Sequence, residues 1–220
     1  MGKRARGKEV KGKKTKDAVK SKIYIFCEGN TEELYLTHFQ NRTYNVEIIP
    51  VDSEHTDAVG IVRYAKQYLQ KNALELEYGD RGYCVFDSDP ASNPYISEAF
   101  NLIEGAREKG LYCIFSNPCF EVWFALHFGN APYGKTAEQM KHHVKKLFKD
   151  EMGINDYCET TDVYPVLLSK QTEAYTRAKQ LHLRQSQVYN VHSHECNPYT
   201  EMFTFIEYMD ELKKRNQKQI

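Results

Sequence analysis

Residues 23–35 read Ile-Tyr-Ile-Phe-Cys-Glu-Gly-Asn-Thr-Glu-Glu-Leu-Tyr, and this stretch indicates the fold. Its first five residues form a continuous apolar run, which is typical of a strand buried on both faces. The polar Glu28-Gly-Asn segment then predicts a turn into a helix that runs from Thr31 to about Gln40. A buried strand that leads through a polar turn into a helix is the repeating unit of a parallel α/β sheet.

The same strand–helix unit recurs along the first half of the chain. Three further apolar runs predict strands at residues 46–51, 83–86 and 111–115. Helices are expected over residues 58–72, 96–109, 120–128, 136–150, 172–187 and 199–215. We therefore predict an α/β domain over residues 22–130, built on a mostly parallel four-stranded sheet with flanking helices. Residues 131–220 are expected to form a helical C-terminal extension packed on it, without a further strand.

Charge is distributed unevenly, although the 220-residue chain has a formal net charge of zero. Residues 1–22 contain ten Lys or Arg and two acids, so the remaining residues carry a net charge of −8 (20 basic minus 28 acidic). Residues 1–21 are predicted to be a disordered basic tail, because they hold few apolar side chains to offset the entropy of ordering. The tail has two interpretations, a solubilising segment or a non-specific contact with a polyanion such as nucleic acid.

The composition indicates a cytoplasmic protein with no membrane span. No apolar run approaches the ~20 residues that a transmembrane helix needs, and the basic start lacks the apolar core of a secretory signal. The six cysteines form no C-x-x-C pair, and three of them fall inside or beside the predicted strands. We expect all six to be free thiols.

Polar residues follow three of the four predicted strands. Glu28 ends the first strand, Asp87 and Asp89 end the third, and Asn117 follows the fourth. The carboxyl ends of parallel strands meet along one edge of a sheet, so these side chains are expected to converge in one crevice. Carboxylate oxygens are the ligands that Mg²⁺ prefers. The sequence therefore predicts a magnesium site at this edge.

Glu32 is a further candidate ligand, because it lies in the first turn of the helix that follows Glu28. Asp87 and Asp89 are two residues apart, so they would point the same way if the strand continued. The simpler interpretation is an Asx turn at Asp87 and a helix-dipole role for Glu32. Acids at equivalent ends of two strands favour the metal site.

Other residues have both a structural and a functional interpretation. Glu121 begins a strongly apolar helix, so it is expected either to face the site or to pair with a basic residue of the C-terminal helices. The basic run around His142 and His143 reads as a solvated helix face or as a nucleic-acid groove. His192, His194 and Cys196 resemble zinc ligands, but their spacing places no fourth ligand.

Several of these motifs resemble a known fold and a known family. Glu28-Gly-Asn-Thr-Glu32 and Asp87-Ser-Asp89, each after an apolar strand, resemble the Toprim fold of primases, topoisomerases and OLD-type nucleases. The opening stretch at residues 25–35, Ser-Asn-Pro-Cys-Phe-Glu-Val-Trp-Phe-Ala-Leu-His-Phe at residues 116–128, and Asn197-Pro198 are similar to the RloB-like family. The resemblance spans roughly residues 20–215.

This resemblance implies a Mg²⁺-dependent (or Mn²⁺-dependent) nuclease with Toprim chemistry. It assigns Glu28 as a metal ligand and general acid/base, Asp87 and Asp89 as the metal-binding pair, and Glu32 as the second acid of OLD-type sites. Glu121 joins the candidate catalytic set on the reasoning given above. The resemblance also implies a place in restriction or abortive-infection (anti-phage) systems beside an ATPase partner. The sequence itself contains no G-x-x-x-x-G-K-[ST] segment.

Three functions therefore remain open from the sequence. The first is a nuclease that cleaves DNA or RNA, and the second is a catalytically quiet nucleic-acid-binding or regulatory subunit. The third is a nucleotide-binding sensor that uses the same crevice. The complete set of acids favours the nuclease hypothesis. The scarcity of a basic groove outside the tail counts against tight nucleic-acid binding by this chain alone. Whether the protein forms homo-oligomers is also left open.

Overall fold

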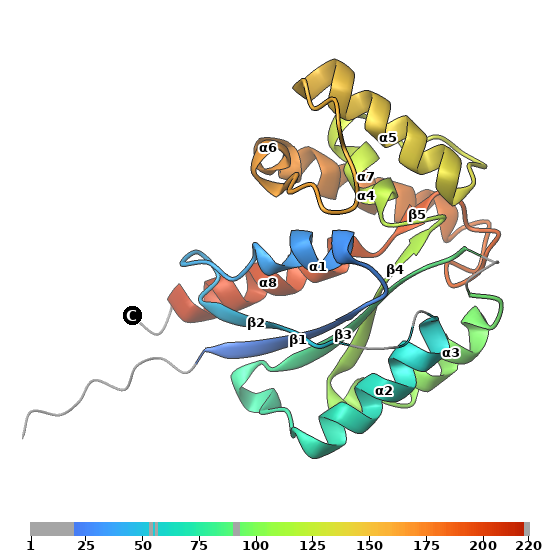
Figure 1. The fold of residues 1–220 in the computed structure, drawn as a ribbon. Helices are drawn as coiled ribbons and strands as arrows, with labels where there is room; N and C mark the ends of the chain where they lie inside the picture. The colour runs from blue at the N-terminus through green and yellow to red at the C-terminus, as the bar shows by residue number, and fades with distance from the viewer. Residues whose placement is uncertain (1–19, 53–54, 56, 90–92, 218–220) are drawn as a thin grey trace, which may run out of the picture.

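The computed structural model of the chain describes residues 20–52, 55, 57–89 and 93–217 (Figure 1). Within these residues there is one five-stranded sheet, in the order β2-β1-β3-β4-β5. Its strands are β1 (Ser21–Cys27), β2 (Val46–Pro50), β3 (Arg81–Asp87), β4 (Leu111–Asn117) and β5 (Tyr199–Thr200). The first four are parallel, so the predicted mostly parallel α/β fold is confirmed. The predicted basic tail lies outside the described residues except at its end, where Ser21 belongs to β1.

The fifth strand corrects the expectation of four. β5 has two residues, and it runs antiparallel to β4 with Thr200 opposite Ser116 and Tyr199 opposite Asn117. The expected helix from residue 199 therefore starts later, as α8 at Met202. A strand of two residues has no apolar run of its own, and its pairing with β4 is decided by tertiary contact.

The helices occur close to the expected places. They are α1 (Asn30–Thr37), α2 (Ala58–Lys71), α3 (Ile96–Glu104), α4 (Glu121–Phe128), α5 (Ala137–Met152), α6 (Tyr164–Leu167), α7 (Gln171–Gln185) and α8 (Met202–Gln217). The short α6 was not expected. The expected helix over 96–109 is interrupted, because α3 ends at Glu104 and a 3₁₀ turn follows before Gly110. Gly110 has a φ of +83°, which favours glycine at the entry to β4.

Both faces of the sheet are covered by helices, as Figure 1 shows. In β1, Tyr24 and Phe26 pack toward α2 and α3, whereas Ile23 and Ile25 pack toward α1 and α8. This alternation explains why the strands are apolar at nearly every position. The helices α4, α5, α6 and α7 lie together at the carboxyl end of β4, and they share the hydrophobic core of α1 and α8.

The described residues bear on two expectations from the sequence, one about membrane spans and one about the state of the cysteines. None of the described helices combines the length and the apolar character that crossing a membrane requires. All six cysteines are free thiols, and five of them are wholly or partly buried while Cys158 is exposed.

Candidate carboxylate site

Glu28 and Asp87 are brought into contact by the pairing of β1 with β3. The backbone N–H of Glu28 donates to the carbonyl of Val85 (3.2 Å), which continues the ladder one residue past the end of β1. The backbone N–H of Asp87 in turn donates to Glu28 Oε2 (3.4 Å). Two acids that are 59 residues apart in the sequence therefore meet at the carboxyl edge of the sheet.

Asn93 organises this edge, and the sequence interpretation missed it. Its buried side-chain amide donates to Glu28 Oε2 (3.1 Å) and to the carbonyl of Asp87 (2.9 Å). Its side-chain oxygen accepts the backbone N–H of Ala58 (2.5 Å) at the start of α2. One amide thus connects β1, β3 and α2. An asparagine in a loop between two prolines reads as an ordinary turn residue, so no local signal distinguishes it.

Asp89 lies near Glu28 but outside the strand. β3 ends at Asp87, so the strand alternation that would align Asp87 with Asp89 does not extend that far. The carbonyl of Asp89 accepts the backbone N–H of Asn93 (2.7 Å), and the charge of Asp89 helps to raise the pKa of Glu28. Asp89 is therefore part of the turn that holds Asn93.

Glu32 and Glu121 complete the cluster from two helices. Glu32 is in the first turn of α1 and Glu121 is the first residue of α4, and their exposed fractions are 6% and 2%. Tyr157 donates its hydroxyl to Glu121 Oε1 (3.4 Å). Glu32 Oε2 is buried without a hydrogen-bond partner among the described residues. A Cβ at Gly29 would lie 3.0 Å from that oxygen, so glycine there leaves room for the carboxylate.

Burial and neighbouring acids raise the pKa values of Glu28, Glu32 and Asp87. Burial is the largest cause for Glu32, whose pKa rises to about 7, and the charges of Glu121 and Glu28 add to it. Burial also raises the pKa of Asp87 well above its usual range, and the charges of Glu32, Glu121 and Glu28 contribute. Burial raises the pKa of Glu28 as well, against the hydrogen bonds from Asn93 and Asp87. The structure thus brings Glu28, Glu32, Asp87 and Glu121 together. Ionising Glu28, Glu32 and Asp87 there costs free energy.

Lys141 is a cation beside this cluster. Its Nζ lies 3.0 Å from Glu159 Oε1, and its charge lowers the pKa of both Glu32 and Asp87. Partial burial lowers the pKa of Lys141 itself, but the charges of Glu121 and Glu159 outweigh that effect and raise it. This stretch of α5 is largely solvated, since the Lys141 side chain is 44% exposed, and the charge of Lys141 also acts on the nearby acids.

The donor chemistry of the cluster fits a hard cation. All candidate ligands are carboxylate oxygens, and the buried, unpartnered Glu32 Oε2 is a free acceptor for one. In the described part of the chain, however, no group of three or more His, Cys, Asp or Glu side chains is arranged as it would be around a metal ion. Binding would therefore require the carboxylates to turn toward one another.

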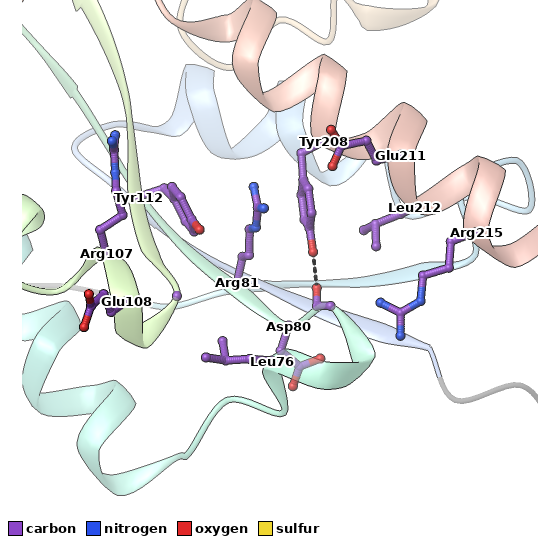
Figure 2. A pocket seen from close by; sticks show the side chains of 12 residues that line it. Leu76, Asp80, Arg81, Arg107, Glu108, Tyr112, Tyr208, Glu211, Leu212 and Arg215 are labelled. Carbon is purple, nitrogen blue, oxygen red and sulfur yellow. Dashed lines mark hydrogen bonds between the residues drawn. The ribbon is translucent and has the colours of Figure 1, made fainter.

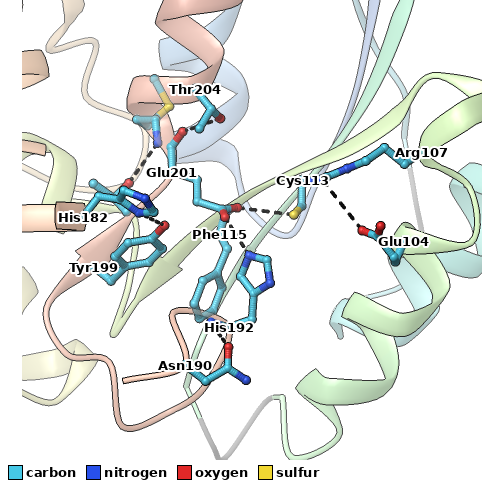
Figure 3. A network of polar contacts seen from close by, with 12 residues as sticks. Glu104, Arg107, Cys113, Phe115, His182, Asn190, His192, Tyr199, Glu201 and Thr204 are labelled. Carbon is cyan, nitrogen blue, oxygen red and sulfur yellow. Dashed lines mark hydrogen bonds and ion pairs between the residues drawn. The ribbon is translucent and has the colours of Figure 1, made fainter. Parts of the chain in front are cut away.

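The possible zinc ligands serve other contacts. His192 Nε2 lies 2.8 Å from Glu201 Oε1 (Figure 3). The His192 ring also stacks on Phe100, with a centroid distance of 3.9 Å. His194 Nδ1 lies instead 2.8 Å from the carbonyl of Ser88, after β3. Glu201 also accepts from Cys113 Sγ (3.3 Å). His192 thus attaches the segment before β5 to α3 and to Glu201, and His194 attaches it to the loop after β3.

Asn117 has a structural role in the same region. Its side-chain amide donates to the carbonyls of Ser193 (3.1 Å) and His194 (3.0 Å), which holds the segment before β5 against the end of β4. Asn117 is the last residue of β4 and lies shortly before the start of α4 at Glu121.

These observations define an α/β protein with a cluster of acids at the carboxyl edge of a mostly parallel sheet. The sequence profile of the RloB-like protein family matches residues 23–209, and the chain belongs to that family. The resemblance inferred from residues 25–35 and 116–128 is thereby confirmed. Comparisons with curated proteins and with solved structures found no match.

Proposed function

We propose that this protein is a Mg²⁺-dependent nuclease of the Toprim type, which cleaves phosphodiester bonds in DNA or RNA. The observation that carries the proposal is the concentration of four buried or half-buried carboxyl groups at one sheet edge, with Lys141 as the cation beside them. Such a cluster costs stability without a counter-ion, and a divalent cation is the counter-ion that suits oxygen ligands.

Each acid has a role that follows from its position. Glu28, Glu32, Asp87 and Asp89 would hold the cation, whose charge would polarise a phosphoryl oxygen and favour deprotonation of a water. Glu28, whose pKa is raised by burial, would also take and return the proton. Glu121 would support the ligands from α4, and Lys141 would limit the repulsion among them.

The biological setting is proposed from the family resemblance. RloB-like proteins are associated with restriction loci and anti-phage systems, so we propose that this chain is the effector of such a system. The printed sequence has no P-loop segment, and an ATPase partner would therefore supply any ATP hydrolysis.

The rival function is a catalytically quiet, nucleic-acid-binding or regulatory subunit of the same kind of system. One observation favours it: among the described residues, no three candidate ligands are arranged around a common point. The two proposals differ in whether a cation binds at the acidic edge.

The deciding experiment combines thermal melts with a cleavage assay. Wild-type protein should gain thermal stability from Mn²⁺, and D87A and D89A should lose that gain because each lacks a ligand. Without metal, both variants should be as stable as wild type or slightly more stable, since one repelling charge is gone. E28Q should keep part of the Mn²⁺ gain but lose cleavage, because an amide cannot accept the proton.

Cleavage should be assayed on single- and double-stranded DNA and RNA with the partner ATPase present. R63Q is the matched control, because Arg63 is exposed on α2 and pairs with Glu98 (2.6 Å) away from the acids. A wild-type melt that Mn²⁺ leaves unchanged, together with no cleavage of any substrate, would establish the quiet subunit instead.

A further inference from the structure

A polar pocket lies at the amino edge of the sheet, opposite the carboxylate site. It has a volume of about 390 Å³ and lies between the start of β3, the start of β4 and α8. Figure 2 shows Arg107, Tyr112, Arg81 and Tyr208 in this order across it, with Arg215 beyond. Arg81 is the first residue of β3 and Asp87 the last, so the two sites are about 20 Å apart along the strand.

The Arg81 guanidinium is held between two aromatic rings. Its central carbon lies 3.3 Å from the ring centroid of Tyr208 and 4.3 Å from that of Tyr112. Tyr208 is itself buried and fixed, because its hydroxyl donates to the carbonyl of Gly79 (2.6 Å). Arg107 approaches Tyr112 as well, with 5.8 Å to the centroid. The two tyrosine rings therefore fix the orientation of the planar Arg81 guanidinium.

The in-plane donors of Arg81 are largely unused. A guanidinium has five N–H donors, all in its plane and none on its faces. Among the described residues, Arg81 donates to Tyr83 Oη at 3.4 Å and forms no ion pair. Stacking on tyrosine covers the faces but leaves the edge free. Arg81 is thus a half-buried cation whose hydrogen-bonding edge has no anionic partner in this part of the chain.

The acids that line the pocket do not supply that partner. Both carboxylate oxygens of Asp80 accept backbone N–H groups, from Lys22 (2.7 Å) and from Glu75 (3.0 Å). Glu108 and Glu211 are exposed, so water screens their charges. Among the described residues, none of these carboxylates forms an ion pair with Arg81.

The most basic segment of the sequence joins the molecule at this same edge. Residues 1–22 contain ten Lys or Arg and two acids, and β1 begins at Ser21. The Ser21 hydroxyl donates to the carbonyl of Tyr78 (2.6 Å), next to the pocket residue Gly79. Of the basic residues in that segment, the structure describes Lys20 and Lys22, which flank Ser21.

We propose that this pocket binds a phosphate group, with Arg81 as the in-plane donor and with Arg107 and Arg215 at its rim. A planar guanidinium fork matches two phosphate oxygens, and the aromatic rings hold it in place before the ligand arrives. The phosphate has two possible sources, a free mononucleotide or the backbone of a nucleic acid. The proposal does not rest on the carboxylate site, since that site lies at the other end of β3.

The test measures phosphate binding by the full-length protein. Inorganic phosphate and adenosine monophosphate are titrated by calorimetry, and a fluorescent oligothymidylate is titrated by polarisation. R81Q should weaken binding of these probes by roughly tenfold or more, because it removes a charge-assisted bidentate contact. R81K should also weaken it, since a lysine keeps the charge but not the fork.

R63Q is again the control, because it removes one exposed arginine and leaves the basic segment in place. R107Q tests the pocket without disturbing the packed stack, since Arg107 is exposed, and it should weaken binding as well. Binding of the mononucleotide alone identifies a small-molecule site, whereas binding of the oligothymidylate alone identifies a backbone site. The proposal is overturned if no probe binds, or if R81Q and R107Q bind every probe as tightly as R63Q.

Discussion

The two ends of β3 carry opposite charges, and these charges lie in different surroundings. At the amino end, Arg81 is stacked between Tyr112 and Tyr208 and keeps its hydrogen-bonding edge free. At the carboxyl end, Asp87 meets further acids, and burial together with those acids raises its pKa. The cation is stabilised by aromatic rings, while the acids are destabilised by one another.

This difference separates two kinds of candidate site. An unpaired arginine on aromatic rings is stable as a charged group, so the amino edge is formed before any ligand binds. The acids are costly as charged groups, so the carboxyl edge should depend strongly on pH and on added cations. Four measurements test whether the carboxyl edge behaves in this way.

The largest effect should be a fall in the stability of the metal-free protein as pH rises. Glu32 has a folded pKa of about 7 against an ordinary value of 4.5, so the native state binds more protons than the unfolded state between these values. The stabilising contribution of this group is therefore fully present below about pH 4.5. It is lost as the pH rises through about 7, and the loss amounts to about 3 kcal/mol. Asp87, whose pKa is also raised, adds to the fall.

Urea unfolding in a chelator at pH 5 and pH 8 measures this fall. E32Q should flatten it, because an amide does not titrate, while E138Q on the exposed start of α5 should not. An equal pH dependence in E32Q and wild type would contradict the buried-acid interpretation of this edge.

The next effect concerns Asn93. N93A should lower the free energy of unfolding by about 2 kcal/mol, because the buried backbone N–H of Ala58 and the carbonyl of Asp87 lose their partner. N101A, on the exposed surface of α3, is the control and should change it by less than about 0.5 kcal/mol. If the two variants unfold at the same urea concentration, Asn93 does not hold the edge together.

A smaller effect is expected from Lys141. K141M should destabilise the metal-free protein by about 1 kcal/mol at pH 8, which is above the pKa of about 7 of Glu32, and by less at pH 5. The exposed Lys145 on the same helix provides the control K145M, which should show no such dependence on pH. Equal losses at both pH values would mean that Lys141 acts through packing and not through its charge.

The smallest effect is a difference in thiol reactivity around the acidic edge. Hydrogen bonds from Thr160 and Thr161 lower the pKa of the exposed Cys158 to about 7. Burial, together with nearby acids, raises the pKa of Cys27 and Cys119 instead. Iodoacetamide at neutral pH should therefore modify Cys158 first, without a change in stability. Mass spectrometry of the native protein that finds Cys27 or Cys119 modified first would show that the edge is open to solvent.

Much of the fold was readable from the sequence because its signals are local. Apolar runs such as residues 23–27 and 111–115 identify buried strands by themselves, and Glu28 and Asp87 stand out because they end such runs. The two-residue β5 had no comparable signal, and neither did Asn93, whose partners lie in three separate elements.

Local patterns in the sequence predict the parallel α/β class, the family and the acids that follow the strands, because periodicity and motifs depend on neighbouring residues. Folding in three dimensions places Lys141 close enough to Glu121 for their charges to interact, and it places Arg81 between Tyr112 and Tyr208. These contacts join residues 20 to 127 positions apart (121 to 141, and 81 to 208). They exist because packing of helices on the sheet brings those positions together, and no local pattern encodes that packing.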